Sequence, residues 1–363
     1  MPSTKIAFIH GRPGNPVHIK YATSTNADLF PVDFYLRWHD KPNSTAFRRY
    51  LSWLLCALFF PNKKKYTIFY TECVRFPVVL MRWLGLLSKK QKIVALLDDE
   101  TMYFIYSKKY SGTTSIAMKK YLQSCDALIC VGKMQTELAK NILQENCPPL
   151  YTIFNGVDNS RAKQLLTLSP SLLSKNIILI ANVDVEWRAW YKGTDIMFRA
   201  FEIASKVIPD IQFTLVGRWD TELLKAQIAQ YCPKFGKNII HVGYTDKLDT
   251  FINDSSLYLH CARGEAWGIS VTEAMASGIP TIVSEWTGAK DVVEQVDESL
   301  IVSLNEKEIA DKIIWYFNLP LEEKKKLSDK CREVVKEYTE ENAVSFHQEK
   351  FAELVKDFGL IKN

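Results

Sequence analysis

Short apolar runs alternate with segments of helical length along most of the chain. Continuous apolar runs of this length are typical of strands buried on both faces of a parallel sheet. They predict strands over residues 5–10, 66–71, 92–97, 126–131, 151–154, 176–182, 212–217, 238–242, 257–261, 280–284 and 300–302. Between them lie helical patterns such as Asp195–Val207 and Thr221–Gln230. Alternating strands and helices predict an α/β protein with doubly wound parallel sheets.

The length and the grouping of the strands predict two domains. The chain has 363 residues, and a domain takes about 150 residues. The strands form two groups separated near residues 155–158, where Asn-Gly is a turn signal. We therefore predict one Rossmann-like domain over residues 1–158 and a second over 159–342, followed by a helical end. Ligands of such proteins bind at the carboxyl ends of the strands, here expected in a crevice between the domains.

Composition is that of an ordinary globular protein, because 24% of the residues are charged and 47% are hydrophobic. Long disorder is therefore excluded. The eight cysteines form no Cys-x-x-Cys pair and no zinc-site spacing, which predicts reduced, buried thiols in a cytoplasmic protein. The first ten residues do not resemble a signal peptide. No run of 18 apolar residues predicts a membrane-spanning helix.

The charge is unevenly distributed. Residues 1–160 carry 21 Lys and Arg against 11 Asp and Glu, whereas residues 161–363 carry 25 against 30. A basic half favours a phosphate-bearing partner, which includes nucleic acid, an anionic membrane face and an anionic acceptor. A chance imbalance on solvated faces explains the counts equally well.

The segment Arg263–Pro280 carries the most informative chemistry. It begins just after the predicted strand 257–261, forms a Gly-containing loop and enters a helix near Ile269–Ser277. A strand, a loop and a helix N-terminus together form an anion site. Glu265 in the loop and Glu273 in the helix add carboxylates that can accept hydrogen bonds from sugar hydroxyls. This chemistry suits a sugar nucleotide; alternatively, Glu265 caps the helix and Glu273 is a solvated or paired residue.

Several motifs resemble those of retaining glycosyltransferase family 4. The central one is Glu265–Pro280, with Gly268 and Glu273-Ala274-Met275-Ala276. Further segments agree in order: Asn155–Asp158, Tyr191–Asp195, Ala200-Phe201, Leu215–Gly217, Thr281–Ser284 and Thr287–Ala289. The resemblance is clear over residues 155–300. Before residue 155 it is limited to the order of the predicted strands and helices. It implies a GT-B fold, in which two Rossmann-like domains face a cleft, the second domain binds the donor, and a final helix within 343–356 returns to the first domain.

The resemblance also implies roles for individual residues. Lys192 matches the lysine that neutralises the donor diphosphate, whose charge grows in the transition state. Glu273 matches the carboxylate that binds the ribose, and Glu265 the one that contacts the donor sugar. The amides that would face the sugar and phosphate are those near Trp267, Gly268 and Ile269.

The sequence departs from the family before Lys192. The family has a Gly-Arg pair where Ala181 and Asn182 stand here, followed by an apparent insertion, residues 184–190. Arg188 either supplies the missing cation or is a surface residue. Arg218, which follows the Leu-Val-Gly segment, is a further donor-side candidate.

The first domain offers acceptor-side candidates. Asp98 and Asp99 stand where the family often has a histidine, and a carboxylate can bind an acceptor hydroxyl. The loop after the first strand lacks the dinucleotide fingerprint, and in GT-B enzymes it approaches donor phosphate and acceptor; its alternative is a plain tight turn. The candidates in this loop are His10, Gly11, Arg12 and Gly14.

Two apolar stretches of the basic half end in lysines. They are residues 48–60, followed by Lys63–Lys65, and residues 78–87, followed by Lys89 and Lys90. Each is too short to span a bilayer, and each either lies on an anionic membrane surface or forms a buried helix with charged ends. Membrane docking would make the acceptor a lipid-linked sugar.

Together these features predict a retaining glycosyltransferase that moves a sugar from a nucleotide-diphosphate sugar to a hydroxyl of a saccharide or lipid-linked acceptor. No Asp-x-Asp motif is present, so we expect metal independence, no cofactor besides the donor co-substrate, and no nucleic-acid partner. One alternative is a non-catalytic GT-B subunit that activates a partner transferase. A nucleotide-dependent oxidoreductase is disfavoured because the dinucleotide fingerprint is absent.

Overall fold

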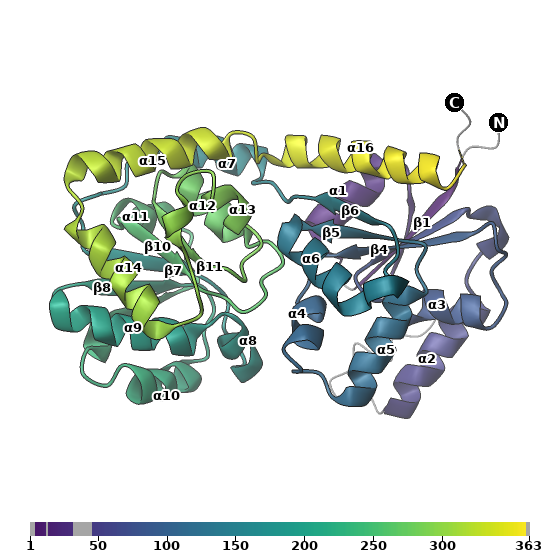
Figure 1. Ribbon diagram of the computed structural model, residues 1–363, viewed down its shortest axis with the longest axis horizontal. Helices are drawn as coiled ribbons and strands as arrows, with labels where there is room; N and C mark the ends of the chain where they lie inside the picture. The colour runs from purple at the N-terminus through teal and green to yellow at the C-terminus, as the bar shows by residue number, and fades with distance from the viewer. Residues whose placement is uncertain (1–3, 12–13, 32–45, 361–363) are drawn as a thin grey trace. The chain divides into compact units, whose positions relative to one another are not determined.

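The computed structural model describes residues 4–11, 14–31 and 46–360 (Figure 1). The chain forms two compact units: unit 1 contains residues 1–154 and 343–363, and unit 2 contains residues 155–342. The boundary between the two units lies after Phe154, four residues before the boundary after Asp158 that the sequence predicts. The reason is that Val157 belongs to unit 2, where its N–H donates to Tyr338 O at 2.9 Å and it forms a β-bridge with Thr339.

Unit 1 is built on a six-stranded parallel sheet of order β2-β1-β3-β4-β5-β6. Its strands are β1 (Ile6–His10), β2 (Asp28–Pro31), β3 (Ile68–Glu72), β4 (Lys92–Leu97), β5 (Ala127–Val131) and β6 (Leu150–Ile153). Its helices are α1 (Pro16–Ser24), α2 (Ala46–Leu58), α3 (Phe76–Trp83), α4 (Thr101–Tyr106), α5 (Gly112–Gln123), α6 (Gly132–Leu143) and most of α16 (Glu340–Asp357).

Unit 2 repeats this architecture with the order β12-β11-β10-β7-β8-β9, again all parallel. Its strands are β7 (Asn176–Ile180), β8 (Gln212–Val216), β9 (Ile239–Gly243), β10 (Leu257–His260), β11 (Thr281–Ser284) and β12 (Ile301–Val302). Its helices are α7 (Asn159–Leu166), α8 (Glu186–Tyr191), α9 (Thr194–Val207), α10 (Thr221–Tyr231), α11 (Leu248–Asn253), α12 (Ile269–Ala276), α13 (Lys290–Val293), α14 (Glu306–Asn318) and α15 (Leu321–Val335).

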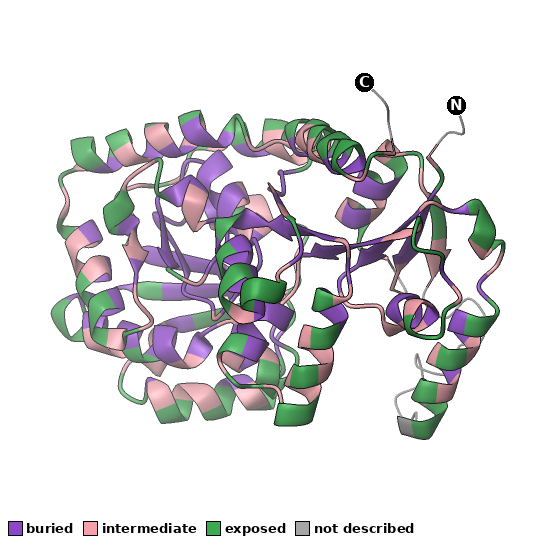
Figure 2. Ribbon diagram, turned by 45° about the vertical axis from the view of Figure 1, so that its right-hand side comes forward, coloured by how far each residue is buried: buried purple, intermediate pink, exposed green. Residues whose placement is uncertain are grey.

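The predicted fold is confirmed, and β2 is the strand that the apolar pattern missed. The strands of both sheet interiors are buried (Figure 2), as their apolar runs predict. By contrast, β2 is a half-exposed edge strand that ends in a proline, so it shows no apolar run.

Helix α16 is part of the core of unit 1. The ring of His347 is fully buried, stacks on Tyr21 at 4.6 Å between centroids and is hydrogen-bonded to the Tyr70 hydroxyl at 2.9 Å. Burial lowers the pKa of His347 to about 3, so the ring is neutral. Phe351 packs on the same tyrosine of β3 at 5.3 Å. The last helix of the chain therefore completes the fold of the first unit.

Each sheet has one point where the order of the strands reverses. In unit 1 the chain runs outward from β1 to β2 and then resumes at β3, on the other side of β1. In unit 2 it runs from β7 through β8 to β9 and resumes at β10, on the other side of β7. Loops at the carboxyl ends of such strand pairs diverge and leave room for a ligand. The two reversal points are therefore where each unit is expected to carry its chemistry.

Candidate functional site

An ion pair between Lys192 and Glu265 lies at the reversal point of unit 2. Lys192 follows β7 and the short helix α8, and Glu265 lies in the loop after β10. Gly193, the next residue, has a φ of +70°, and a Cβ there would come within 2.0 Å of Cys261 O. A glycine is therefore required for the chain bearing Lys192 to approach the chain bearing Glu265.

The charges around Glu265 keep its carboxyl ionised. Burial by itself raises the pKa of this group, but the charge of Lys192, with a smaller contribution from His260, holds it well below its usual range. His260 is fully buried at the end of β10, and burial lowers its pKa, so its ring is neutral. Its Nε2 lies 3.7 Å from Glu265 Oε2 and has no hydrogen-bond partner among the described residues. Sequence reasoning missed His260 because it lies inside an apolar strand pattern.

The loop that carries Glu265 is fastened on both sides. On one side the guanidinium of Arg263 donates to both carboxylate oxygens of Asp195, at 2.7 and 2.9 Å, and to Trp190 O at 2.6 Å. On the other, the Gly288 N–H donates to Glu265 O at 2.8 Å and the Ala289 N–H to Trp267 O at 2.8 Å. A fixed loop keeps the carboxylate in one geometry, as a binding site requires.

The N-terminus of α12 is open beside this loop. Gly268 precedes the helix with a φ of +90°, and no side chain caps the first turn. The first amides of a helix lack partners within it and carry a partial positive charge. Trp267 is buried just before them, and Ile269 is the first helical residue. The structure therefore contains the loop and the uncapped helix start that the sequence predicts, and a helix start of this kind can bind an anion.

Glu273 has different surroundings from Glu265. It lies on the second turn of α12, where burial raises the pKa of its carboxyl, opposed by the charge of Arg161 on α7 and reinforced by that of Asp158. Arg161 is paired with Asp249 at 2.7 Å, and its Nη2 is buried with no hydrogen-bond partner in the described part of the chain. Arg161 was missed by sequence reasoning because α7 has no motif that marks it.

The two arginine candidates of unit 2 have other partners. Arg188 pairs with Asp184 one helical turn away at 3.1 Å, and its guanidinium lies 5.4 Å from the ring centre of Trp187. Arg218 is exposed at the end of β8, where its N–H donates to Asn182 Oδ1 at 2.9 Å. The structure therefore brings Lys192 and Glu265 together, whereas the contacts of Arg188 and Arg218 among the described residues are with other groups.

A second polar cluster occupies the reversal point of unit 1, and it centres on His18 and Glu72. Glu72, the last residue of β3, accepts hydrogen bonds from the N–H groups of Gly11 at 2.5 Å and Asn15 at 3.0 Å. His18, on α1, contacts Glu72 through Nδ1 at 2.9 Å and Asp98 through Nε2 at 2.7 Å. Neither residue was predicted, because neither belongs to a motif.

Only some of the acceptor-side candidates of unit 1 belong to this cluster. Asp98 belongs to it, whereas Asp99 accepts from the Thr101 N–H at 3.0 Å at the start of α4. His10 Nδ1 lies 2.7 Å from Gly11 O, and a Cβ on Gly14 would come within 2.8 Å of the same Nδ1. Arg12 lies outside the described residues.

The described residues contain neither a candidate metal-binding cluster nor a membrane-spanning helix. No group of three or more His, Cys, Asp or Glu side chains among residues 4–11, 14–31 and 46–360 could hold a metal ion. No helix in that part of the chain is both long and apolar enough to cross a bilayer.

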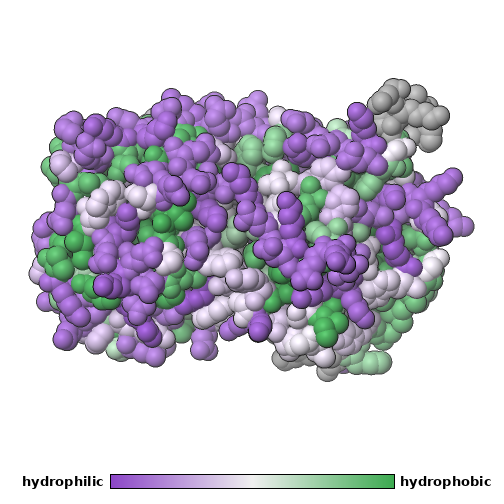
Figure 3. Space-filling view, in the orientation of Figure 1, coloured by the Kyte–Doolittle hydropathy of each residue, from purple (hydrophilic) through white to green (hydrophobic). Residues whose placement is uncertain are grey.

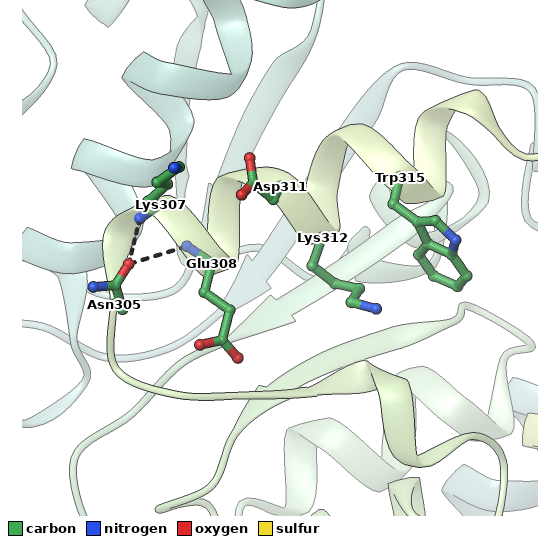
Figure 4. Close-up of a pocket in the computed structure, with 6 residues that line it drawn as sticks. All are labelled: Asn305, Lys307, Glu308, Asp311, Lys312 and Trp315. Atoms are coloured by element: carbon green, nitrogen blue, oxygen red, sulfur yellow. Dashed lines mark hydrogen bonds between the residues drawn. The ribbon is translucent and has the colours of Figure 1, made fainter.

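A hollow of about 460 Å³ on the surface of unit 2 is separate from the predicted site residues (Figure 4). It is formed by α14 and the residue that caps it, and its lining residues are Asn305, Lys307, Glu308, Asp311, Lys312 and Trp315. None of these was a candidate, and their side chains lie along one exposed helix.

Comparison with known proteins identifies the domain type of unit 2. Residues 175–337 match the family Glycosyl transferases group 1, so this domain is present in the chain. An uncharacterized glycosyltransferase of Haemophilus influenzae is 23% identical over 240 residues, 64% of this chain and 64% of that protein. A phosphatidyl-myo-inositol mannosyltransferase of Mycobacterium leprae is 29% identical over 116 residues, 31% of this chain and 29% of that protein. The chain thus spans less than two thirds of each of these relatives.

The fold itself is shared with solved structures over almost the whole chain. The Anabaena protein HepE, solved with UDP and glucose, superposes with a TM-score of 0.65 at 14% identity, covering 97% of this chain and 99% of that one. The predicted GT-B fold is therefore confirmed, as is the prediction of a glycosyltransferase domain.

Replacing Lys192 with Gln tests the electrostatics of the ion pair. Because the folded-state pKa of Glu265 is depressed, its stabilisation is present at neutral pH and lost as the pH falls through the folded-state pKa. We expect the variant to lose about 3 kcal/mol of unfolding free energy at pH 7, and less at pH 3.5, measured by urea denaturation. Lys175→Gln, which breaks an exposed pair with Asp210, should change it little. An equal loss at both pH values would mean that packing, and not charge, explains the effect.

Proposed function

We propose that the protein is a retaining, metal-independent glycosyltransferase that uses a nucleotide-diphosphate sugar as donor. The main observation that supports this proposal is the Lys192–Glu265 ion pair. It lies beyond the carboxyl ends of β7 and β10, beside the uncapped N-terminus of α12. This arrangement lies within the region that matches the family. It combines a cation and free amides for a diphosphate with carboxylates for sugar hydroxyls.

The chemistry assigns a task to each group. Lys192 and the amides at Gly268 and Ile269 would stabilise the negative charge that grows on the leaving diphosphate. Glu265, held by Lys192, would fix the hydroxyls of the donor sugar, and Glu273 those of the ribose. No protein nucleophile is needed, because the leaving phosphate can take the proton of the acceptor hydroxyl on the same face of the sugar.

The acceptor is a hydroxyl of a saccharide or of a lipid-linked sugar, and unit 1 is proposed to contact it. Asp98 is the candidate that would bind this hydroxyl. We propose that the protein acts in the cytoplasm, in part at the inner face of the membrane. Arg188 and Arg218 would join the donor only after rearrangement of their present contacts.

An apolar face on α2 supports the membrane contact. Phe47, Tyr50, Leu54 and Leu58 recur at helical spacing and are exposed, with Phe47 73% exposed. Helix α3 packs on α2, where Trp53 stacks on Phe76 at 5.1 Å. Hydrophobic surface is visible over this part of unit 1 in Figure 3.

Cations accompany this face. One exposed cation lies within α2 and three others follow α2 or α3: Arg48, Lys64, Lys89 and Lys90. An apolar helix face with adjacent cations matches the interface of an anionic bilayer, where rings enter the acyl boundary and cations meet headgroups. We therefore propose anionic phospholipid as the partner of the α2 face, with the lipid-linked acceptor delivered there.

Donor binding is tested by thermal unfolding in EDTA with UDP, GDP and ADP. One nucleotide at 100 times its Kd should add about 2.7 kcal/mol to the unfolding free energy. Lys192→Gln and Glu273→Gln should weaken that shift, whereas Lys175→Gln and Glu323→Gln, on exposed surfaces, should retain it. A shift that appears only with added Mg²⁺ would contradict metal independence, and no shift with any nucleotide would contradict the donor site.

Transfer is tested by incubating the protein with the stabilising nucleotide as its sugar conjugates and with saccharide or lipid-linked acceptors. We expect a product whose anomeric configuration, read by NMR, equals that of the donor. Lys192→Gln should lower kcat by about a hundredfold, since it removes charge stabilisation of the leaving group. Inversion at the anomeric carbon would overturn the retaining assignment. Nucleotide binding without transfer to any acceptor would favour a non-catalytic subunit, which the lost Gly-Arg pair also suggests.

Membrane contact is tested by co-sedimentation with vesicles of phosphatidylcholine alone or with phosphatidylglycerol. Binding should require the anionic lipid, and F47E with Y50E should weaken it about a hundredfold or more, because each buried ring contributes roughly 1.5–3 kcal/mol, which is at least about tenfold in affinity. Leu173→Glu, an equally exposed apolar position of unit 2, serves as the control. Binding that is equal for both vesicle types, or absent, would refute the proposal.

A further inference from the structure

The cluster at the reversal point of unit 1 is built around a histidine between two carboxylates. His18 is 2% exposed, and its two ring nitrogens face Glu72 at 2.9 Å and Asp98 at 2.7 Å. Ionised carboxylates are acceptors only, so both ring nitrogens must carry protons to bond to both. A neutral ring would leave one nitrogen lone pair facing a carboxylate oxygen.

Glu72 must be ionised, because four donors converge on it. Its Oε1 accepts hydrogen bonds from the Asn15 N–H and from the ring of His18. Its Oε2 accepts them from the Gly11 N–H and from Arg75 Nη2, the latter at 2.7 Å. Burial raises the pKa of Glu72, but the hydrogen bond from His18, those from the two backbone N–H groups and the charge of Arg75 hold it well below its usual range. The proton of the cluster therefore belongs on His18 or on Asp98.

The charges around the ring favour His18. Burial by itself lowers the pKa of the imidazole, but the hydrogen bonds and charges of Asp98 and Glu72 outweigh burial and raise it to about 9. Arg75 pairs with Oε2 of Glu72 at 2.7 Å, while His18 faces Oε1 of the same carboxylate. His10, on β1, faces backbone oxygen, and Asp99 faces the start of α4.

The cluster joins three separate pieces of chain. Glu72 ties the backbone after β1 to the end of β3, and His18 ties both to the residue that follows β4. Directly after β3, Cys73 has a φ of +53°, a backbone conformation that residues other than glycine rarely adopt. Residues in such conformations persist where the surroundings over-determine them, often at functional sites.

We propose that doubly protonated His18 is a positioning residue that holds Asp98 and the backbone at Gly11 and Asn15 in the geometry that meets the acceptor hydroxyl. This rests on the proposed function, in which Asp98 binds that hydroxyl. His18 acts through Asp98 and does not contact the acceptor itself. Loss of its proton loosens Asp98 and slows transfer to the acceptor.

The protonation state is tested first on the unchanged chain. NMR of the protein labelled with ¹⁵N at histidine should show one ring that stays doubly protonated at pH 8 and titrates near pH 9. His18→Gln should remove that signal, and His241→Gln, at an exposed histidine of β9, should leave it. If every histidine ring is neutral at pH 8, the proposal is wrong, whatever the enzyme does.

The positioning role is tested by kinetics as a function of pH. His18→Gln should lower kcat/KM for the acceptor by about tenfold to a hundredfold, because small misplacements at a reacting centre cost this much. The stabilisation by the donor nucleotide should be retained. The fall in kcat/KM of the unchanged chain above pH 9 should disappear in the variant, and His241→Gln should keep the profile of the unchanged chain.

The outcomes separate the two proposals. Unchanged acceptor kinetics in a folded His18→Gln variant would reduce His18 to a structural residue and overturn the positioning role. If that variant does not fold, Asp98→Asn provides the test, since it must lower kcat/KM for the acceptor and bring the titration of His18 toward an ordinary pKa. Absence of transfer by the unchanged chain would contradict the proposed function, and the inference about acceptor positioning would fall with it, while the NMR titration would still decide the charge of His18.

Discussion

The pairing of parallel strands buried on both faces is the constraint on which the rest of this structure depends. Such strands satisfy their backbone groups within the sheet and leave their faces to apolar packing. Polar chemistry is therefore confined to the strand ends, and the loops there diverge where the strand order reverses. Both polar clusters of this protein occur at those points, after β7 and β10 in unit 2 and after β1 and β3 in unit 1.

The same electrostatic requirement governs both clusters. A charge that is partly removed from water needs an opposite charge or hydrogen-bond donors nearby, because the free energy of desolvating an unpaired charge strongly destabilises the folded state. In unit 2 one lysine meets one glutamate, and the pKa of Glu265 is low because of that lysine. Among the described residues of unit 1, His18 contacts Glu72 and Asp98, and Arg75 contacts Glu72. Compensation also fixes geometry, because each carboxylate is held by donors from separate segments of chain.

The two clusters differ in how far they could be foreseen. Lys192, Gly268 and Glu273 belong to motifs with fixed spacing, so they could be recognised within one segment each. His18 and Glu72 are 54 positions apart and occur in unremarkable helix and strand patterns. Their contact depends on β1 and β3 being neighbours in the sheet, which no local spacing encodes. His260 was hidden for a similar reason, since a polar residue at the end of an apolar strand gives no separate signal.

The sequence by itself determined the fold class, the two-domain organisation, nearly all of the strands and the family motifs of unit 2, because apolar periodicity and motif spacing are local properties of the chain. Only the tertiary structure decided which side chains meet. It paired Lys192 with Glu265, placed Arg188 beside Asp184, gave Asp98 and Asp99 different contacts, and brought His18 between two carboxylates. Such contacts depend on strand order and loop direction, which are set by packing over the whole domain.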